Sequence, residues 1–429
     1  MKSLAALLLT AAAATLHAAP ATDWPRFLGP IGAAIVTESK VPLKWSDTEN
    51  LLWKADMPGP GASSPIVLGD KVFITCWTGY GDKPGANDAS KLTRHLICLN
   101  SADGKLVWDA KVPSAATEDP WQGFITEHGY ATHTPVTDGE RVYVFFGKSG
   151  ALAFDLQGKQ LWQTSCGTSS GQRRWGSAAS PIIHGNLLIV NANDESQTIF
   201  GLDKATGKIV WKAEGDFGMA YGTPNILRRD GVDDLVIAVP QELWGMNPET
   251  GKLRWYAAHG LTGNVSPSLV PGGGDTVYVF GGFPSTRSTA IKLGGKGDLG
   301  SKAILWDSSS SSYVPTPILK DGHLYVINDQ GFALCIDAKT GEDVYRERAI
   351  MGSRGGGKPF YASPVLIGDN LICVSRRNGA FVLAAKPQFE VIATNEFKQD
   401  DSHFNATPAI SGDRLILRSN KAVYCVGTK

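Results

Sequence analysis

The chain has 429 residues and carries 41 Lys and Arg against 41 Asp and Glu, so its formal net charge is zero. This balance argues against nucleic acid as the main partner and against broad electrostatic binding to anionic membranes. The 49 Gly, 24 Pro and 12 Trp are typical of many short strands joined by tight turns, and no long amphipathic helix is visible. We therefore expect an all-β protein.

Residues 1–21 are predicted to be a signal peptide. Lys2 gives a positive start, residues 4–16 form an apolar run rich in Ala and Leu, and small residues at 18, 19 and 21 offer cleavage positions. The run is too short for a comfortable membrane span, and no later segment reaches that length. We therefore expect export to a periplasm or to the outside of the cell, with no transmembrane segment.

A short motif recurs along the rest of the chain: a small residue, then Ser or Thr, then Pro, then an apolar run. Its copies, mostly 43 to 50 residues apart, lie at Pro65, Pro135, Pro181, Pro224, Pro317, Pro364 and Pro408, with Val265-Ser266-Pro267 as a looser copy. Each repeat has the pattern of four short strands, and stacking such units around an axis buries the faces between neighbours. We predict an eight-bladed β-propeller of four-stranded antiparallel blades, forming a single domain over residues 22–429.

The two ends of the chain complete this prediction. The last repeat starts at Asn405 and supplies three strands before the chain stops at Lys429. The segment N-L-L-W-K-A-D-M at 50–57 matches K-L-V-W-D-A-K-V at 105–112, which is the fourth strand of the first repeat. We therefore expect the N-terminal strand, at about 50–57, to complete the last blade and close the ring, which removes open sheet edges.

A turn between the third and fourth strands is best seen in residues 201–215. Asp203 can accept hydrogen bonds from backbone N–H groups of the turn, and Gly207 can take the positive φ that closes it. Trp211 follows in the fourth strand. Its counterparts are Trp53, Trp108, Trp162, Trp255 and Trp306. We expect this series to pack between blades.

All six cysteines lie after residue 21, and none forms a Cys-x-x-Cys pattern, which removes the usual spacing for zinc or a redox dithiol. Cys98, Cys335 and Cys425 occupy the same place in three repeats and are most simply small apolar strand residues. In an exported protein, oxidation of a neighbouring pair such as Cys76 and Cys98 is the alternative.

The repeat resembles the propeller repeat named after pyrroloquinoline quinone (PQQ). The resemblance rests on D-K-A-T-G-K-I-V-W at 203–211 and N-P-E-T-G-K-L-R-W at 247–255, and it covers almost the whole chain after residue 21. The opening D-W-P-R-F-L-G-P, residues 23–30, is similar to the start of exported quinone-repeat proteins of undefined function. The superfamily includes BamB-like subunits of outer-membrane barrel assembly and quinoprotein dehydrogenases.

The two branches imply different chemistry. In the dehydrogenase branch the ring holds PQQ and Ca²⁺ near its axis and a catalytic Asp acts as base, often above a pair of adjacent cysteines. No two cysteines are adjacent here, and a complete set of calcium and base carboxylates is not matched. The BamB-like branch is non-catalytic, but the lipoprotein Cys of that subunit is missing. No catalytic residue, metal ligand or resident cofactor is assigned, with PQQ and calcium as the alternative.

Candidate binding residues lie on the loops that propeller topology brings to one face. These are the loops from strand four to the next strand one and from strand two to strand three, around an axial funnel suited to a small polar or anionic molecule. The ligand-binding candidates are Trp77, His133, Arg174, Trp175, Tyr221, Arg354, Tyr361 and Arg376.

Four groupings on these loops admit two interpretations each. Arg173-Arg174-Trp175 suits a carboxylate, phosphate or sugar, or is a solvated loop. Arg376-Arg377-Asn378 is expected to be a solvated hairpin tip rather than a site. Asn193-Asp194-Glu195 is expected to be an exposed acidic turn, with Ca²⁺ binding as the alternative. His128 and His133 give only a weak zinc signal.

The function that these observations favour is a non-catalytic binding or assembly scaffold with an axial funnel for a protein partner or a small polar or anionic ligand. The alternatives are a PQQ-dependent dehydrogenase that oxidises an alcohol or a sugar, and a carbohydrate-binding module using Trp77, Trp175 and Tyr221. The common serine hydrolase, P-loop and zincin motifs are absent. A monomer is expected.

Overall fold

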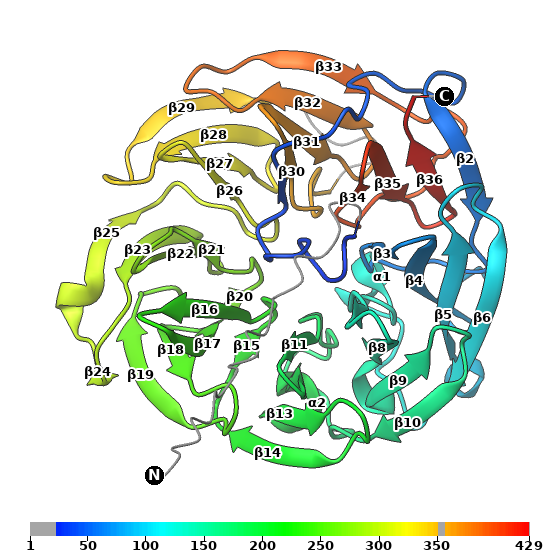
Figure 1. Ribbon diagram of the computed structural model, residues 1–429, viewed down its shortest axis with the longest axis horizontal. Coiled ribbons are helices and arrows are strands. Elements are labelled where there is room, and N and C mark those ends of the chain that lie inside the picture. The colour runs from blue at the N-terminus through cyan, green and yellow to red at the C-terminus, as the bar shows by residue number, and fades with distance from the viewer. Residues whose placement is uncertain (1–22, 351–356, 429) are drawn as a thin grey trace, which may run out of the picture.

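The computed structural model describes residues 23–350 and 357–428. Eight antiparallel sheets stand around a central axis as the blades of a β-propeller, and the chain passes from one blade to the next around the ring (Figure 1). This confirms the predicted all-β fold with eight four-stranded blades. The predicted signal peptide and Arg354 lie outside the described residues.

The strands of each blade follow in chain order from the axis outward. Blade 1 contains β3 (Ile66–Leu68), β4 (Lys71–Thr78), β5 (Thr93–Asn100) and β6 (Leu106–Pro113); blade 2 contains β7 (Val136–Thr137), β8 (Arg141–Phe145), β9 (Ala151–Asp155) and β10 (Gln160–Thr164). Blade 3 contains β11 (Ile182–His184), β12 (Leu187–Ala192), β13 (Thr198–Asp203) and β14 (Ile209–Glu214); blade 4 contains β16 (Asn225–Arg229), β17 (Val232–Val239), β18 (Glu242–Met246) and β19 (Leu253–Ala258).

The second half of the ring repeats this order. Blade 5 contains β21 (Val270–Pro271), β22 (Thr276–Gly281), β23 (Arg287–Lys292) and β25 (Ile304–Ser308); blade 6 contains β26 (Ile318–Lys320), β27 (His323–Ile327), β28 (Phe332–Asp337) and β29 (Asp343–Arg348). Blade 7 contains β30 (Val365–Ile367), β31 (Asn370–Val374), β32 (Ala380–Ala384) and β33 (Val391–Asn395).

Blade 8 is built from both ends of the chain. Its first three strands are β34 (Ala409–Ser411), β35 (Arg414–Arg418) and β36 (Ala422–Val426), and its outer strand is β2 (Leu51–Asp56). β2 pairs antiparallel with β36, with Leu51 opposite Val426 and Asp56 opposite Ala422. The segment that the repeat analysis assigned to this position therefore occupies it.

Short elements outside the blades decorate the ring. β1 (Ile35–Val36) adds in parallel to β30, β24 (Gly297–Asp298) adds in parallel to β19, and β15 (Met219–Ala220) pairs in parallel with β20 (Asn264–Val265). The helical elements are α1 (Ile125–His128), α2 (Asn193–Ser196) and three 3₁₀ turns at Ala89–Lys91, Gly147–Ser149 and Ser301–Ala303. Within the described ranges, every helix is too short to be a membrane span.

Adjacent blades are held together by the Trp series and the turn that follows it in the next blade. Trp211 of blade 3 donates its indole N–H to Pro248 O at 3.1 Å. Its ring covers Gly251, where an added Cβ would lie 2.4 Å from the indole. The same pairing joins Trp53 to Ser101, Trp108 to Leu156, Trp162 to Lys204 and Trp306 to Ala338. The predicted packing of Trp between blades is confirmed.

Trp255 departs from this pattern because its indole N–H donates to Asp234 of its own blade, at 2.9 Å. The indole still packs among Val277, Val279 and Ile291 of blade 5. Blade 5 has a glycine-rich excursion where most other blades have the turn, so the usual carbonyl acceptor is not offered there. Packing between blades is therefore kept while the hydrogen bond changes partner.

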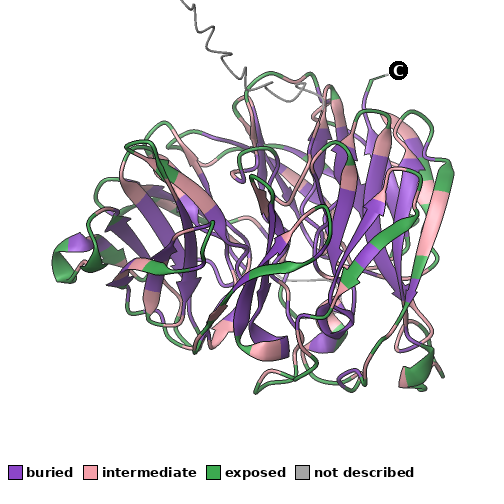
Figure 2. Cartoon of the chain, turned by 60° about the horizontal axis from the view of Figure 1, so that its bottom comes forward, coloured by how far each residue is buried: buried purple, intermediate pink, exposed green. Residues whose placement is uncertain are grey.

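The hydrophobic core lies between the sheets of neighbouring blades. Figure 2 shows buried residues along the strands and exposed residues mainly in the loops and outer strands. All six cysteines are buried and free, so the alternative of a Cys76–Cys98 disulfide is wrong. Cys98, Cys335 and Cys425 are buried residues of β5, β28 and β36, as their places in the repeats predicted.

Candidate functional site

A series of hydroxyl groups links the inner strands of the blades around the axis. From Ser64 to Ser363, the backbone N–H of each residue in the series donates to the hydroxyl oxygen of the next, over 2.9 to 3.2 Å. The members are Ser64, Thr134, Ser180, Thr223, Ser268, Thr316, Ser363 and Thr407, and all are buried. Seven of them are the Ser or Thr of the repeat motif, so the motif positions this ring.

Blade 5 corrects one detail of the repeat alignment. The looser copy was placed at Val265-Ser266-Pro267, but the residue that takes part in the ring is Ser268, which accepts from Thr223 N and whose own N–H donates to Thr316. The residue after Ser268 is Leu269 rather than Pro. The hydroxyl is thus the part of the motif that the structure uses, and the proline is replaceable.

An axial cavity of about 160 Å³ lies inside this ring. Aromatic rings form much of its wall above the hydroxyl groups. Phe124 lies 4.9 Å from Trp175 and 6.1 Å from Tyr361, and Trp175 lies 6.5 Å from Tyr221, measured between ring centroids. Tyr313 also lines the cavity, and its hydroxyl accepts from Asn264 Nδ2 at 3.0 Å. The wall is therefore aromatic and hydrogen-bonding at once.

The N-terminal segment occupies the end of the axial channel away from these aromatic loops. In Figure 1 this dark-blue segment crosses the centre of the ring. Trp24 forms an antiparallel bridge with Val67 of blade 1, and Pro25 O accepts from Thr137 N of blade 2. Further on, the segment adds β1 to blade 7. Between these anchors Phe27 reaches the cavity. The segment 23–36, called the plug from here on, therefore fills one end of the channel.

The long connection between blades 1 and 2, residues 114–129, spans the other end. Near α1, Glu127 forms an ion pair with Arg376 at 2.6 Å, and Glu127 O accepts from Asn405 Nδ2 at 2.7 Å. Arg376 also stacks on Tyr361, 4.4 Å from the ring centroid. We call this connection the strap because it joins blades 1 and 2 to blades 7 and 8.

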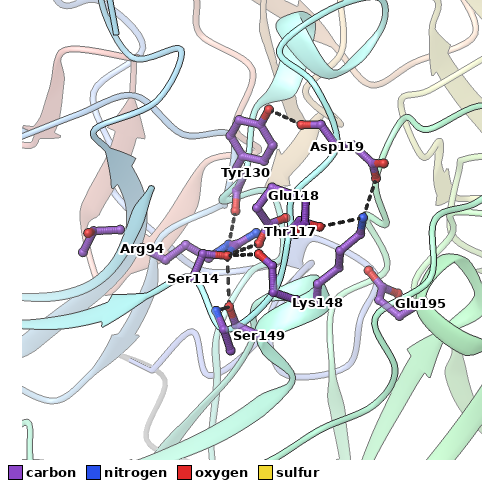
Figure 3. A network of polar contacts seen from close by, with 12 residues as sticks. Arg94, Ser114, Thr117, Glu118, Asp119, Tyr130, Lys148, Ser149 and Glu195 are labelled. Carbon is purple, nitrogen blue, oxygen red and sulfur yellow. Dashed lines mark hydrogen bonds and ion pairs between the residues drawn. The ribbon is translucent and has the colours of Figure 1, made fainter. Parts of the chain in front are cut away.

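Buried ion pairs hold the other end of the strap. Arg94 Nη1 donates to Glu118 at 2.8 Å, and Lys148 lies 3.3 Å from Asp119 (Figure 3). Lys148 also donates to Thr117 O at 3.2 Å. Breaking such a pair leaves one charge buried and uncompensated, which typically costs about 3–5 kcal/mol. These contacts therefore position Phe124 and α1 over the axis.

Asn193, Asp194 and Glu195 do not form the exposed acidic turn that was expected. They are the first three residues of α2, and all three are buried beneath the strap. Ser177 Oγ donates to Glu195 Oε1 at 2.5 Å and lies 3.0 Å from His133 Nε2. From the sequence alone, a tight turn with three polar residues predicts a surface loop. In the structure the strap, which connects blades 1 and 2, covers this turn of blade 3.

Burial shifts the pKa values of this cluster in opposite directions, upward for the two acids and downward for the histidine. Burial, opposed by the Ser177 hydrogen bond, raises the pKa of Glu195 to about 8. Burial and then Asp119 raise the pKa of Asp194 to about 6. Burial, followed by the charge of Arg94, lowers the pKa of His133 to about 3. Near neutral pH, His133 is neutral and Glu195 holds its proton, so the contacts of Ser177 with these two side chains are neutral hydrogen bonds.

These shifts predict how stability depends on pH. A protonated Glu195 contributes stability that is complete below its ordinary pKa and is lost as the pH rises through about 8. Glu195→Gln keeps a neutral side chain of the same shape, so we expect its free energy of unfolding to fall less than that of the wild type between about pH 5 and 8, the interval between the ordinary and the raised pKa of Glu195. The difference should approach about 1.4 kcal/mol per pH unit within that window. Urea unfolding at each pH measures it.

Glu214→Gln, at an exposed position of β14, is the matched control and should follow the wild-type curve. His133 has the opposite sign: its contribution is present at neutral pH and is lost as the pH falls below its ordinary value of 6.5. Equal slopes for Glu195→Gln and wild type would contradict a protonated Glu195.

The structure brings together some of the candidate residues that the sequence suggested. Trp175, Tyr221 and Tyr361 line the axial cavity. Arg376 is buried in the strap contact, so the solvated hairpin tip expected there is wrong for Arg376. His133 lies in the polar cluster behind the wall.

The remaining candidates lie elsewhere. Trp77 is buried in a separate hydrophobic cluster with Tyr80 and Tyr130, and its indole N–H donates to Tyr80 O. Arg174 is exposed and has a positive φ of 52°. Its neighbour Arg173 is the residue that reaches the Trp175 ring, at 5.8 Å.

Several cavity residues were not among the candidates, including Phe27 and Phe124. Phe27 belongs to D-W-P-R-F-L-G-P, the segment singled out by resemblance, and Phe124 belongs to the long connection after blade 1. Both residues lie in segments outside the repeat, so the repeat pattern does not predict that they reach the axis. Their departure from the repeat, in segments rich in aromatic residues, is the signal that would have found them.

The wall does not fit the Ca²⁺-bound quinone implied by the dehydrogenase branch. Ca²⁺ takes six to eight oxygen ligands, usually including carboxylates. The described residues of the wall include no Asp or Glu. Across residues 23–350 and 357–428, no group of three or more His, Cys, Asp or Glu is arranged to hold a metal ion. The carboxyl groups of α2 lie behind the wall and are engaged with the strap cluster.

Comparison with protein families matches residues 47–220 and 192–388 to the family described as outer membrane protein assembly factor BamB. The two matches overlap and together reach from residue 47 to residue 388. Because this span exceeds half of the chain, it confirms the resemblance drawn from the turn motif.

Individual relatives are more distant. The chain is 25% identical over 259 residues to tetrathionate hydrolase of Acidithiobacillus ferrooxidans, covering 57% of this chain and 50% of that protein. It is 23% identical over 356 residues to polyvinylalcohol dehydrogenase of a Pseudomonas species, covering 72% of this chain and 48% of that protein. The chain thus spans about half the length of these curated relatives.

Among solved structures, BamB from Moraxella catarrhalis superimposes with a TM-score of 0.60 at 14% identity, covering 88% of this chain and 97% of that one. At this identity the likeness concerns the fold alone.

Proposed function

Because the chain belongs to the family of the outer membrane protein assembly factor BamB, we propose that it is a non-catalytic binding scaffold. Its binding face is the one that carries the strap and the aromatic loops, and its occupant is a protein partner or a small ligand that enters the axial cavity. The single observation that carries this proposal is the wall of aromatic rings and hydroxyl groups without an ionised side chain among the described residues.

The chemistry of the wall supports binding over catalysis. General acid–base catalysis needs a group that titrates near the working pH and touches the reacting atoms. Burial lowers the pKa of His128 to about 4, and burial raises the pKa values of Tyr221, Tyr313 and Tyr361 well above neutrality. All four side chains are therefore neutral at pH 7. Aromatic faces and neutral hydrogen-bonding groups suit an aromatic side chain or an uncharged polar ring such as a sugar.

The proposed site of action is outside the cytoplasm, in a periplasm or the extracellular space. The proposal rests on the apolar N-terminal stretch that precedes Asp23 in the sequence. The chain is proposed to act as a monomer, because the ring closes on itself through β2 and β36.

The competing function is a PQQ-dependent dehydrogenase, which the similarity to polyvinylalcohol dehydrogenase favours. Calorimetric titration of the mature protein with PQQ and Ca²⁺, followed by dye-linked oxidation of polyvinyl alcohol, ethanol and glucose, distinguishes the two. We expect neither saturable binding nor turnover, with a known quinoprotein dehydrogenase as positive control. Tight binding together with turnover would overturn the scaffold proposal.

The binding face is tested by photo-crosslinking in the cells that make the protein. A photoreactive residue at Arg174 or Arg377, both exposed on the strap face, is compared with one at Lys208, exposed on an outer turn. We expect a discrete crosslinked partner from the first two positions and none from Lys208. Crosslinks from all three positions, or from Lys208 alone, would contradict a partner on the strap face. Screening the protein on a glycan array tests the alternative of a carbohydrate-binding module.

A further inference from the structure

Arg26 places a positive charge inside the plug. It lies between Pro25, which is fixed to blade 2 through Thr137, and Phe27, which lines the axial cavity. Its guanidinium reaches blade 4, where Nη2 lies 3.4 Å from Asn225 Oδ1, a long contact with a neutral group. The side chain also fills the space beside Gly32, where an added Cβ would lie 2.7 Å from Nη2.

No carboxylate of the described chain compensates this charge. Arg26 forms no ion pair within residues 23–350 and 357–428, although the ion pairs found there engage eight other arginines. Its Nε–H is buried and has no acceptor in that part of the chain. Burial alone lowers its pKa, to about 10, with no contribution from a neighbouring acid. A cation in this position is costly unless a counter-ion joins it.

The wall of the axial cavity, which the neighbouring residue Phe27 helps to line, favours an anion over a cation. Each hydroxyl oxygen from Thr134 to Thr407 in the axial series accepts a backbone N–H, and none of these hydroxyl groups has a protein acceptor for its own proton in the described ranges. The axial wall therefore offers spare O–H donors. It offers no Asp or Glu among its described residues. The Arg26 residue is partly exposed although its Nε is buried, so part of the residue is open to solvent.

We propose that Arg26 is an anion-binding residue and that the plug end of the axial channel takes a small carboxylate. A carboxylate matches the planar fork of a guanidinium and accepts two parallel N–H bonds from it. The inference does not depend on the scaffold role, because it concerns the uncompensated charge of Arg26 alone.

The proposal is tested with acetate as the probe and Arg26→Met as the variant. Thermal unfolding of the mature protein is followed while sodium acetate replaces sodium chloride at constant ionic strength. We expect a saturable rise in Tm of roughly 2–5 °C for the wild type and none for Arg26→Met. Arg26→Lys keeps the charge but loses the fork, so it should retain only part of the rise. Arg287→Met, which removes an arginine paired with Asp307 on the surface, is the control and should respond like the wild type.

Two further measurements keep the test decisive. In chloride at low concentration, Arg26→Met should be no less stable than the wild type, because an apolar side chain of similar length replaces an uncompensated cation. Saturation-transfer NMR with acetate on the wild type reports binding directly and needs no variant. Sulfate competition distinguishes a general oxyanion site from one selective for carboxylates. An equal rise in Tm for wild type and Arg26→Met, or an NMR experiment without saturable acetate binding, would overturn the proposal.

Discussion

Deleting residues 23–58 is expected to abolish cooperative thermal unfolding of the ring. The deletion removes β2, so β36 loses its antiparallel partner from Leu51 to Asp56 and blade 8 is left with three strands. It also removes Trp53, whose indole N–H donates to Ser101 O of blade 1 at 3.0 Å. Loss of a buried Trp alone costs about 3–5 kcal/mol, and a folded domain has a net stability of only about 5–15 kcal/mol. Differential scanning calorimetry and near-UV circular dichroism measure the result.

Two companion variants separate ring closure from the other contacts of this segment. A circular permutant moves residues 37–58 behind Lys429 through a short turn, which is feasible because Val426 lies opposite Leu51. We expect this permutant to recover a cooperative transition. Deleting the plug alone, residues 23–36, keeps β2 and should lower Tm without abolishing the transition. A deletion of 23–58 that unfolds like the full chain would show that the ring does not depend on β2.

The second large effect is expected for Trp211→Ala, which should lower the free energy of unfolding by about 3–5 kcal/mol. Trp211 is 8% exposed and lies in the core between blades 3 and 4, against Leu235 and Ile237. Its removal leaves a cavity against Gly251 and takes the donor away from Pro248 O. Urea denaturation, with the m-value compared to wild type, measures the loss.

Trp211→Phe and Trp175→Ala complete this experiment. Phe keeps most of the apolar contact but removes the indole N–H, so its cost should be smaller than that of Ala and consist of a little lost packing area and one hydrogen bond of about 1 kcal/mol. Trp175 lines the axial cavity rather than the core between blades, so Trp175→Ala should cost much less than Trp211→Ala. Equal costs for the two alanine variants would contradict the assignment of Trp211 to blade cohesion.

The fold was predictable because the same local physics recurs in every repeat. The hydroxyl of the motif, the Asp and Gly of the outer turn and the Trp of the fourth strand each make the same contact in most blades, as Asp203, Gly207 and Trp211 illustrate. Because the pattern recurs in eight repeats, it predicts the fold although a single copy would be weak evidence. The misplaced motif of blade 5 shows the limit, since alignment on Pro267 hid the hydroxyl of Ser268.

The site was less predictable because its decisive contacts join segments that differ from the repeat. Glu127 and Arg376 lie 249 positions apart, and neither residue carries a local signal for the other. Asp194 and Glu195 read as a surface turn until the strap covers them. Trp175, Tyr221 and Tyr361 were found because propeller topology alone assigns their loops to one face. Phe27 and Arg26 were missed because that topology says nothing about where an N-terminal extension runs.

The axial series of hydroxyl groups has an evolutionary consequence. Each link uses one backbone amide and one hydroxyl oxygen, so Ser and Thr are interchangeable at a given position, and the chain does use Ser180 beside Thr223. The spacing of the wall therefore does not depend on how many residues lie between successive hydroxyl groups, a number that varies from 43 to 70. Loop exchange between blades or between relatives can therefore create a new binding face without altering the frame that carries it. Selection on such a protein acts on the loops and leaves the axial hydroxyl groups in place.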